Sequence, residues 1–191
     1  MITLPFFFVF MIIIFSIIGS LRGWAKEILV TFSIILGIFI ISILSGIKIF
    51  PPLPENFQLN SPDAFTQART FFWVRSAILI ILVFFGYQTP SLPKIGGQRF
   101  AREQFQDFLL GFFLGALNGF LFVGSLWFFM KEARFPYAPH IRDLAPNDPG
   151  YSSLAMTMQM VVKWLAPAWL QGFTLYIAVA IAFVFVIIVF L

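Results

Sequence analysis

The chain has 191 residues, of which 60% are hydrophobic and 10% charged, and its mean hydropathy is +0.96. A soluble domain carries about 25% charged residues, so this composition predicts an integral membrane protein. The absence of cysteine excludes disulfides, thiol catalysis and cysteine-ligated metal. The net charge of +4 comes from only 12 Lys and Arg, which favours loops near anionic lipid over a nucleic-acid interface with its clustered basic face.

Residues 4–21 form the first apolar run, just long enough to span a hydrocarbon core of about 30 Å. No basic residue precedes this run and no small-x-small cleavage site follows it, so we predict an uncleaved transmembrane helix rather than a signal peptide. A short turn at 22–27 leads into a second helix, predicted over 25–50 and ended by two prolines. Glu27 lies in its first turn, where the helix dipole favours an acidic side chain.

A third helix is predicted from Ser61 to about Tyr87, with Ser61 as its N-cap and Pro62 at its first position. Its membrane-embedded part begins near Phe71, which places Arg75 about 6 Å inside that edge. The favoured interpretation is that Arg75 extends back to the interface. The alternative is a buried charge that lines a pathway.

The fourth apolar helix, residues 107–129, has one face of small and polar residues. At about 100° per residue, one face collects Asp107, Gly111, Gly115, Asn118 and Gly119. Large Phe and Leu side chains cover most of the remaining surface. A small face on a membrane helix favours close packing against another helix. The less common alternative is a face that lines a pore, with Asn118 as a polar contact.

The composition changes after residue 130. Residues 131–150 are predicted to form a proline-rich loop, in which the single His140 is typical of a solvated residue rather than a metal ligand. A short helix lying in the membrane interface is predicted over 152–165, and a fifth transmembrane helix over 172–191. The fold class is therefore an all-α integral membrane protein, a bundle of four to five transmembrane helices with one short interfacial helix.

No catalytic pattern is found along the chain: there is no G-x-S-x-G, no phosphate-binding glycine loop and no His-acid cluster. We therefore expect no enzyme, no cofactor and no metal site. The clearest constellation is one of charges, because Asp107 begins its helix on the same membrane side as Arg22 and Lys26. We expect Asp107 to pair with one of these two basic groups. The alternative is that the charges face water, where such a pair contributes about 0–1 kcal/mol.

Two segments together resemble the colicin V production protein (CvpA) family. Residues 19–27 match the family's G-x-x-R-G-x-x-x-E turn, with its defined positions at Gly19, Arg22, Gly23 and Glu27. Residues 107–119 are similar to the family's D-R-x-L-G-x-x-x-G-x-x-R-G segment, although Phe108 and Asn118 stand where the pattern has arginine. The resemblance covers residues 1–130, expected to be a four-helix membrane domain. Residues 131–191 then supply the loop, the interfacial helix and the fifth transmembrane helix.

The resemblance implies a non-enzymatic, multi-pass protein of the bacterial inner (cytoplasmic) membrane, associated with colicin V production or export or with envelope maintenance. Its expected partners are the lipid bilayer and either a second copy of the chain or an export or envelope protein, with no nucleic acid. The alternative function is an oligomeric channel or small-solute transporter whose protomers pack through the glycine face. Phe108 and Asn118 make that face more apolar than the family pattern, which favours packing over permeation.

Overall fold

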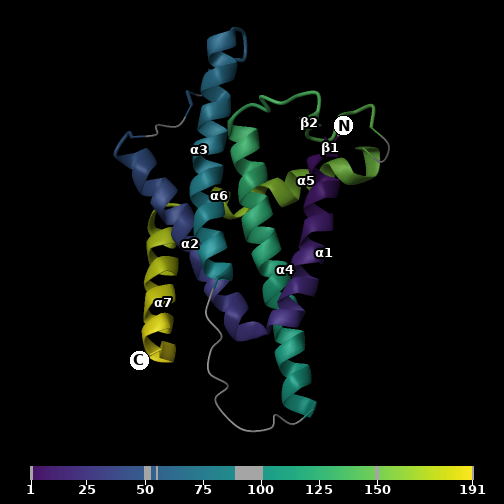
Figure 1. Ribbon diagram of the computed structural model, residues 1–191. Helices are drawn as coiled ribbons and strands as arrows, with labels where there is room; N and C mark the ends of the chain where they lie inside the picture. The colour runs from purple at the N-terminus through teal and green to yellow at the C-terminus, as the bar shows by residue number, and fades with distance from the viewer. Residues whose placement is uncertain (1, 50–52, 55, 89–100, 149–150, 191) are drawn as a thin grey trace.

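The computed structural model describes residues 2–49, 53–54, 56–88, 101–148 and 151–190, and these are almost entirely helical (Figure 1). The helices are α1 (Leu4–Arg22), α2 (Trp24–Gly46), α3 (Pro62–Tyr87), α4 (Ala101–Glu132), α5 (Tyr151–Trp164), α6 (Ala166–Trp169) and α7 (Gly172–Phe190). Two short strands, β1 (Ile2–Thr3) and β2 (Ile141–Arg142), complete the fold. The predicted all-α membrane fold is confirmed.

Among the described residues, four helices are long and apolar enough to cross a membrane: α1, α2, α3 and α4. Within each of these helices, an 18-residue stretch has a mean hydropathy between 1.9 and 2.7. Helix α7 is apolar over Gly172–Ile188 but is not among these four. The chain is thus a multi-pass membrane protein, and the fifth crossing by α7 stays a prediction.

Local sequence signals explain where helices begin and end. The Ser61 hydroxyl accepts a hydrogen bond from the Ala64 N–H at 3.2 Å, which caps α3 as predicted. Helix α2 ends at Gly46, four residues before the predicted end at residue 50. Lys48, two residues later, has a φ of 60° that a helix cannot continue through.

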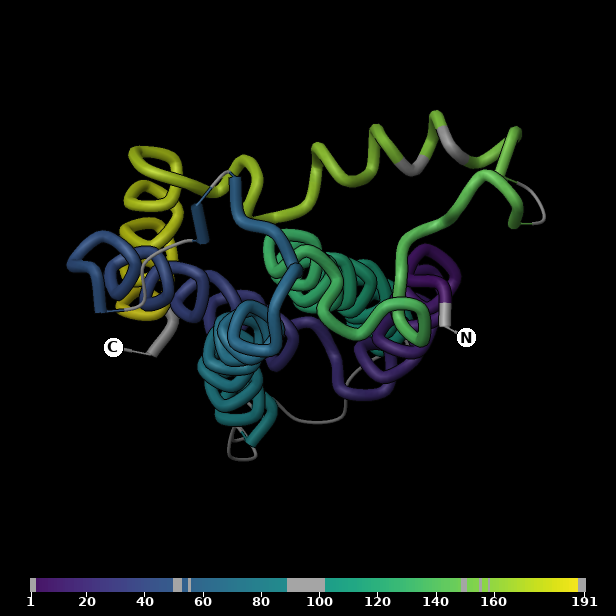
Figure 2. The backbone as a smooth tube through the Cα atoms, turned by 90° about the horizontal axis from the view of Figure 1, so that it is seen from above, coloured from purple at the N-terminus to yellow at the C-terminus, as the bar shows by residue number. Residues whose placement is uncertain are grey.

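The helices form a bundle in which α4 has a central place (Figures 1 and 2). Helix α1 packs mainly on α4, α2 packs on both α3 and α4, and α7 lies against the outer side of α2. Ile34, Leu79, Trp127 and Phe129 are among the fully buried core residues. The outer surface carries many exposed Phe, Ile and Leu side chains, which suits a bundle whose solvent is lipid.

Helix α5 runs across the bundle rather than along it (Figures 1 and 2). Met156, Met160 and Trp164 are exposed on this helix. An apolar exposed helix in this orientation fits the predicted position in the membrane interface.

The segment after α4 is held by contacts that the sequence did not predict. Strand β2 pairs in parallel with β1, in the register Ile2 to Ile141 and Thr3 to Arg142, which fixes the start of the chain to this segment. Arg142 forms a bidentate ion pair with Asp148, in which both N–O distances are 2.6 Å. The hydrogen bonds from Arg142, together with one from the Ala145 N–H, lower the pKa of Asp148 to about 2.

Candidate functional site

The turn between α1 and α2 lies against Asp107 and Gly111 of α4. Gly23 has a φ of 83°, a conformation that side chains with a Cβ rarely adopt, and an added Cβ would lie 2.7 Å from the Asp107 Oδ1. The Asp107 carboxylate accepts a hydrogen bond from the Trp24 N–H at 3.1 Å. The first N–H groups of a helix have no partner inside it, so Asp107 of α4 acts as an N-terminal cap for α2.

Glu27 is the charged centre of the site. Its exposed fraction is 0%, and its Oε1 lies 2.5 Å from Nη1 of Arg22. Arg22 also donates to the Tyr87 carbonyl oxygen at 3.1 Å, and its guanidinium carbon lies 4.3 Å from the centre of the Tyr87 ring. A buried carboxylate requires such a partner. The ion pair therefore joins α1 to α2, and the contacts of Arg22 with Tyr87 add α3.

Asn118 joins α4 to the same group. Its exposed fraction is 0%. Its Nδ2 donates to the Glu27 Oε2 at 2.8 Å and to the Glu27 carbonyl oxygen at 2.9 Å. Its Oδ1 accepts from the Thr31 hydroxyl at 2.7 Å. Both ends of the Asn118 amide are thus satisfied, as a buried polar network requires if it is to rigidify the surrounding structure. We call Arg22, Glu27, Thr31, Tyr87 and Asn118 the polar cluster.

Glycines allow α1 and α4 to approach each other closely beside the polar cluster. A Cβ on Gly19 would lie 2.3 Å from the Gly111 carbonyl oxygen, and one on Gly115 would lie 2.3 Å from the Phe15 carbonyl oxygen. A Cβ on Gly119 would lie 2.9 Å from the Phe15 Cβ. The obstructing atoms at Gly19 and Gly115 belong to backbone, which cannot move aside as a flexible side chain can. The small face of α4 is therefore filled by α1 of the same chain.

The structure brings the two sequence segments together into one site. Gly19 and Gly23 lie against Gly111, Gly115 and Asp107 of α4, and Glu27 bonds to Asn118. Arg22 joins the site through Glu27, and Gly119 lies against Phe15 of α1.

The expected ion pair of Asp107 with Arg22 or Lys26 is replaced by other contacts. Among the described residues, Arg22 forms its ion pair with Glu27 rather than with Asp107, and Lys26 forms none. The reason is geometric: Asp107 lies over the start of α2, where it accepts a backbone N–H.

Sequence reasoning missed two members of the polar cluster, Thr31 and Tyr87. Thr31 lies four residues after Glu27, so helical spacing places both on one face of α2. That spacing was an available signal for Thr31. Tyr87 comes from α3 and could be found only from the packing of helices.

Arg75 lies apart from the polar cluster, toward the other end of the bundle. Its exposed fraction is 7%, and its Nη1 lies 2.6 Å from Oε2 of Glu132, the last residue of α4. Nη2 donates to the Ser45 hydroxyl at 3.1 Å. The guanidinium carbon also lies 4.0 Å from the centre of the Phe71 ring. Arg75 is thus buried and paired, and sequence reasoning did not foresee Glu132 as its partner.

The comparisons with known proteins place this geometry in context. Residues 4–143 match a family model described as "Colicin V production protein". The match runs from the start of α1 to just past β2 and includes both segments of the site. No curated protein and no solved structure matches the chain.

Proposed function

Because the chain belongs to the colicin V production protein family, we propose that it is a non-enzymatic protein of the bacterial inner membrane that supports toxin production or export, or maintains the envelope. The family match covers residues 4–143, which include the polar cluster and all four long apolar helices. The role we assign is structural. The bundle would hold a fixed arrangement of helices that a second copy or another membrane protein recognises.

The closed polar cluster is the observation that carries this proposal. Glu27 and Asn118 both have an exposed fraction of 0% and bond to each other and to neighbouring helices. A catalytic carboxylate must reach a substrate, and a permeation face must meet water. Glu27 and Asn118 do neither in the folded chain, because both are fully buried. The polar cluster joins four helices, which supports a role in fixing their arrangement.

The filled glycine face supports packing over permeation. Gly111 and Gly115 lie against the backbone of α1, so another protomer has no access to them. Contacts with a second copy or with an export or envelope protein would then use the outer apolar faces of the bundle.

An oligomeric channel or small-solute transporter is the second candidate function. The observation that favours it is a cavity of about 410 Å³ that adjoins Arg75 and is also lined by Thr66, Gln67 and Thr70 of α3. Buried charges that line cavities mark solute pathways in many membrane proteins, although this cavity is also lined by apolar Ile49, Leu53 and Val74. In this reading Arg75 would be a pathway residue, and an oligomer would complete the route.

Two assays on the full chain separate these functions. The first uses a bacterium that carries the colicin V system but lacks its own family member. The proposal expects the wild-type chain to restore colicin V secretion or resistance to detergents, Asn118→Ala to restore less, and Ser125→Ala to act as wild type. Ser125 is a matched control because it is buried on α4 and, within the described part of the chain, its hydroxyl bonds only to its own helix.

The second assay measures solute flux into liposomes containing the purified chain. The proposal expects flux equal to that of empty liposomes. A solute flux that needs the protein and changes in Asn118→Ala or Arg75→Gln would establish the channel or transporter instead. Failure to restore either secretion or detergent resistance would reject the proposed function.

A further inference from the structure

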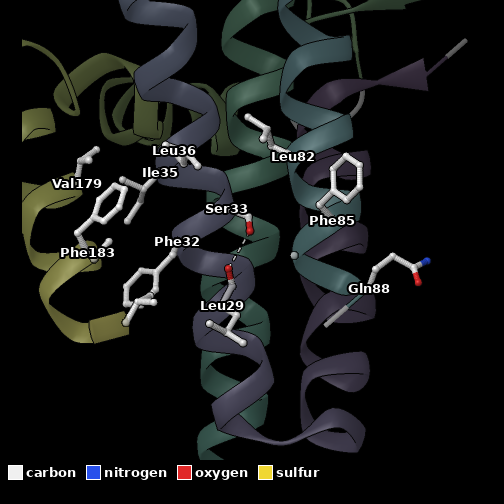
Figure 3. Close-up of a pocket in the computed structure, with 13 residues that line it drawn as sticks. Leu29, Phe32, Ser33, Ile35, Leu36, Leu82, Phe85, Gln88, Val179 and Phe183 are labelled. Carbon is white, nitrogen blue, oxygen red and sulfur yellow. Dashed lines mark hydrogen bonds between the residues drawn. The ribbon is translucent and has the colours of Figure 1, made fainter. Parts of the chain in front are cut away.

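A groove of about 540 Å³ lies on the outer side of the bundle, between α2, α3 and α7 (Figure 3). Figure 3 shows Leu82 and Phe85 of α3 on one side and Phe183 of α7 on the other, with α2 between them. The Ser33 hydroxyl inside the groove donates to the Leu29 carbonyl oxygen of its own helix at 3.0 Å. The middle of the groove therefore offers an apolar surface, suited to a hydrocarbon ligand.

The packing of α7 explains why the groove is open. Helix α7 rests on α2 through two edge-to-face ring contacts, Phe32 with Phe185 at 5.3 Å and Phe39 with Tyr176 at 5.7 Å between ring centres. It packs on α2 rather than on α3. The groove between α3 and α7 therefore stays open along α2. Figure 2 shows α7 beside α2 and apart from α3.

A basic residue extends the floor of the groove. Lys26, Leu29, Ser33 and Leu36 follow one another at intervals of three and four residues, so they form one stripe along α2. Lys26 lies about 10 Å along the axis from Ser33, toward the end of α2 where Trp24 is exposed. Exposed Trp is typical of the membrane interface.

The charge of Lys26 is not neutralised by Glu27, the acidic residue next to it in the sequence. Glu27 is buried and engaged by Arg22, and within the described part of the chain Lys26 has no ion pair or side-chain hydrogen bond. The stripe therefore joins an apolar floor to an unpaired ammonium group at membrane-interface depth.

We propose that this groove binds one acyl chain of an anionic phospholipid whose phosphate lies at Lys26. The apolar lining selects hydrocarbon, and the free ammonium group at one end selects a negative headgroup. A lipid chain is narrow enough to follow the groove along α2.

Native mass spectrometry of the full-length protein tests the headgroup site. The probes are phosphatidylglycerol and phosphatidylcholine with identical dioleoyl chains. Wild-type protein retains more phosphatidylglycerol, and Lys26→Gln lowers its apparent affinity about fivefold, the effect of one surface Lys on an anionic lipid, while phosphatidylcholine binding is unchanged. Lys48→Gln is the matched control, because Lys48 is exposed beyond the other end of α2.

A second pair of variants tests the acyl-chain site. Ala182→Phe fills the groove from α7 and lowers retention of both lipids, whereas Val184→Phe on the exposed side of α7 does not. Val186→Phe, also in the groove, repeats the test if Ala182→Phe fails to give a monodisperse protein.

Three results would overturn the proposal. One is equal retention of the two lipids by the wild-type protein. Another is an equal loss in Lys48→Gln and Lys26→Gln. The third is a dimer that Ala182→Phe abolishes without changing lipid retention, which would assign the groove to a second copy. These measurements do not depend on toxin or envelope function, so the two proposals stand or fall separately.

Discussion

The amide nitrogen of Asn118 lies 2.8 Å from the Glu27 Oε2, although the two residues are 91 positions apart in the chain. This contact joins the turn that begins α2 to the middle of α4. Both residues have an exposed fraction of 0%, so neither can exchange its partner for water. The two sequence segments that resemble the family are thus parts of one buried unit, and its members are expected to be strongly coupled in energy.

The first prediction concerns Asn118→Ala. The substitution removes the donor to the buried Glu27 Oε2 and one of the two acceptors of the Thr31 hydroxyl, which keeps the Glu27 carbonyl oxygen. We expect a loss of about 1–3 kcal/mol in the free energy of unfolding, the usual cost of buried polar groups left unpaired. Reversible unfolding in mixed micelles measures it. Ser125→Ala should cost less, because its hydroxyl bonds only to the Leu121 carbonyl in the same helix; equal losses would contradict the coupling.

The second prediction concerns the buried ion pair. Glu27→Leu leaves Arg22 without its carboxylate, and we expect a loss of about 3–5 kcal/mol. The double variant Arg22→Met with Glu27→Leu removes both charges and should recover much of that loss. A double-mutant cycle in the same unfolding assay gives the coupling energy. Simple additivity of the two single losses would show that the pair does not hold the helices together.

The third prediction concerns the close contact of α1 and α4. In Gly115→Ala the new Cβ would lie 2.3 Å from the Phe15 carbonyl oxygen, so the helices must move apart. Overpacking of this kind costs about 1–3 kcal/mol. Gly46→Ala on α2 is the control, because a Cβ there meets no atom within 4 Å. Thermal unfolding monitored by circular dichroism should show a lower midpoint for Gly115→Ala alone; no difference between the two variants would argue against the observed packing.

The fourth prediction separates two roles of Asp107. Asp107→Ala removes the acceptor for the Trp24 N–H and should cost about 0.5–2 kcal/mol, as loss of a helix cap does. Asp107→Asn keeps an acceptor oxygen. If capping is the main role of Asp107, this variant should lose only a few tenths of a kcal/mol in the free energy of unfolding. Hydrogen exchange at the first turn of α2 reports the cap directly. Losses of equal size would instead assign the effect to the charge of Asp107.

The fifth prediction concerns the pH dependence of the segment after β2. The pKa of Asp148 is lowered from 3.8 to about 2 by its hydrogen bonds, so its contribution to stability is fully present above pH 3.8 and is lost as the pH falls toward 2. Arg142→Gln should return the pKa of Asp148 toward its usual value. A carboxyl-carbon NMR titration in micelles measures the shift. Lys48→Gln, far from this ion pair in the sequence, should leave the titration unchanged, and an unshifted pKa in Arg142→Gln would contradict the assignment.

The sequence determined the features of this protein that depend on a few neighbouring residues. Long apolar runs predicted the helices of α1 to α4, because hydrocarbon leaves a spanning backbone few alternatives to internal hydrogen bonds. Ser61 and Pro62 marked the start of α3, because a cap bonds within one turn. Helical spacing also placed Asp107, the glycines and Asn118 on one face of α4.

Only the tertiary structure decided which groups meet across helices. Hydropathy is similar in all the apolar helices, so it does not say that α1 rather than a second chain covers the glycine face. The pairing of Arg22 with Glu27 and of Arg75 with Glu132 depends on helix rotations and depths that no local pattern encodes. Buried polar groups must find partners wherever the packing brings them. The sequence therefore determined which segments form apolar helices, and the packing of those helices determined which side chains pair between them.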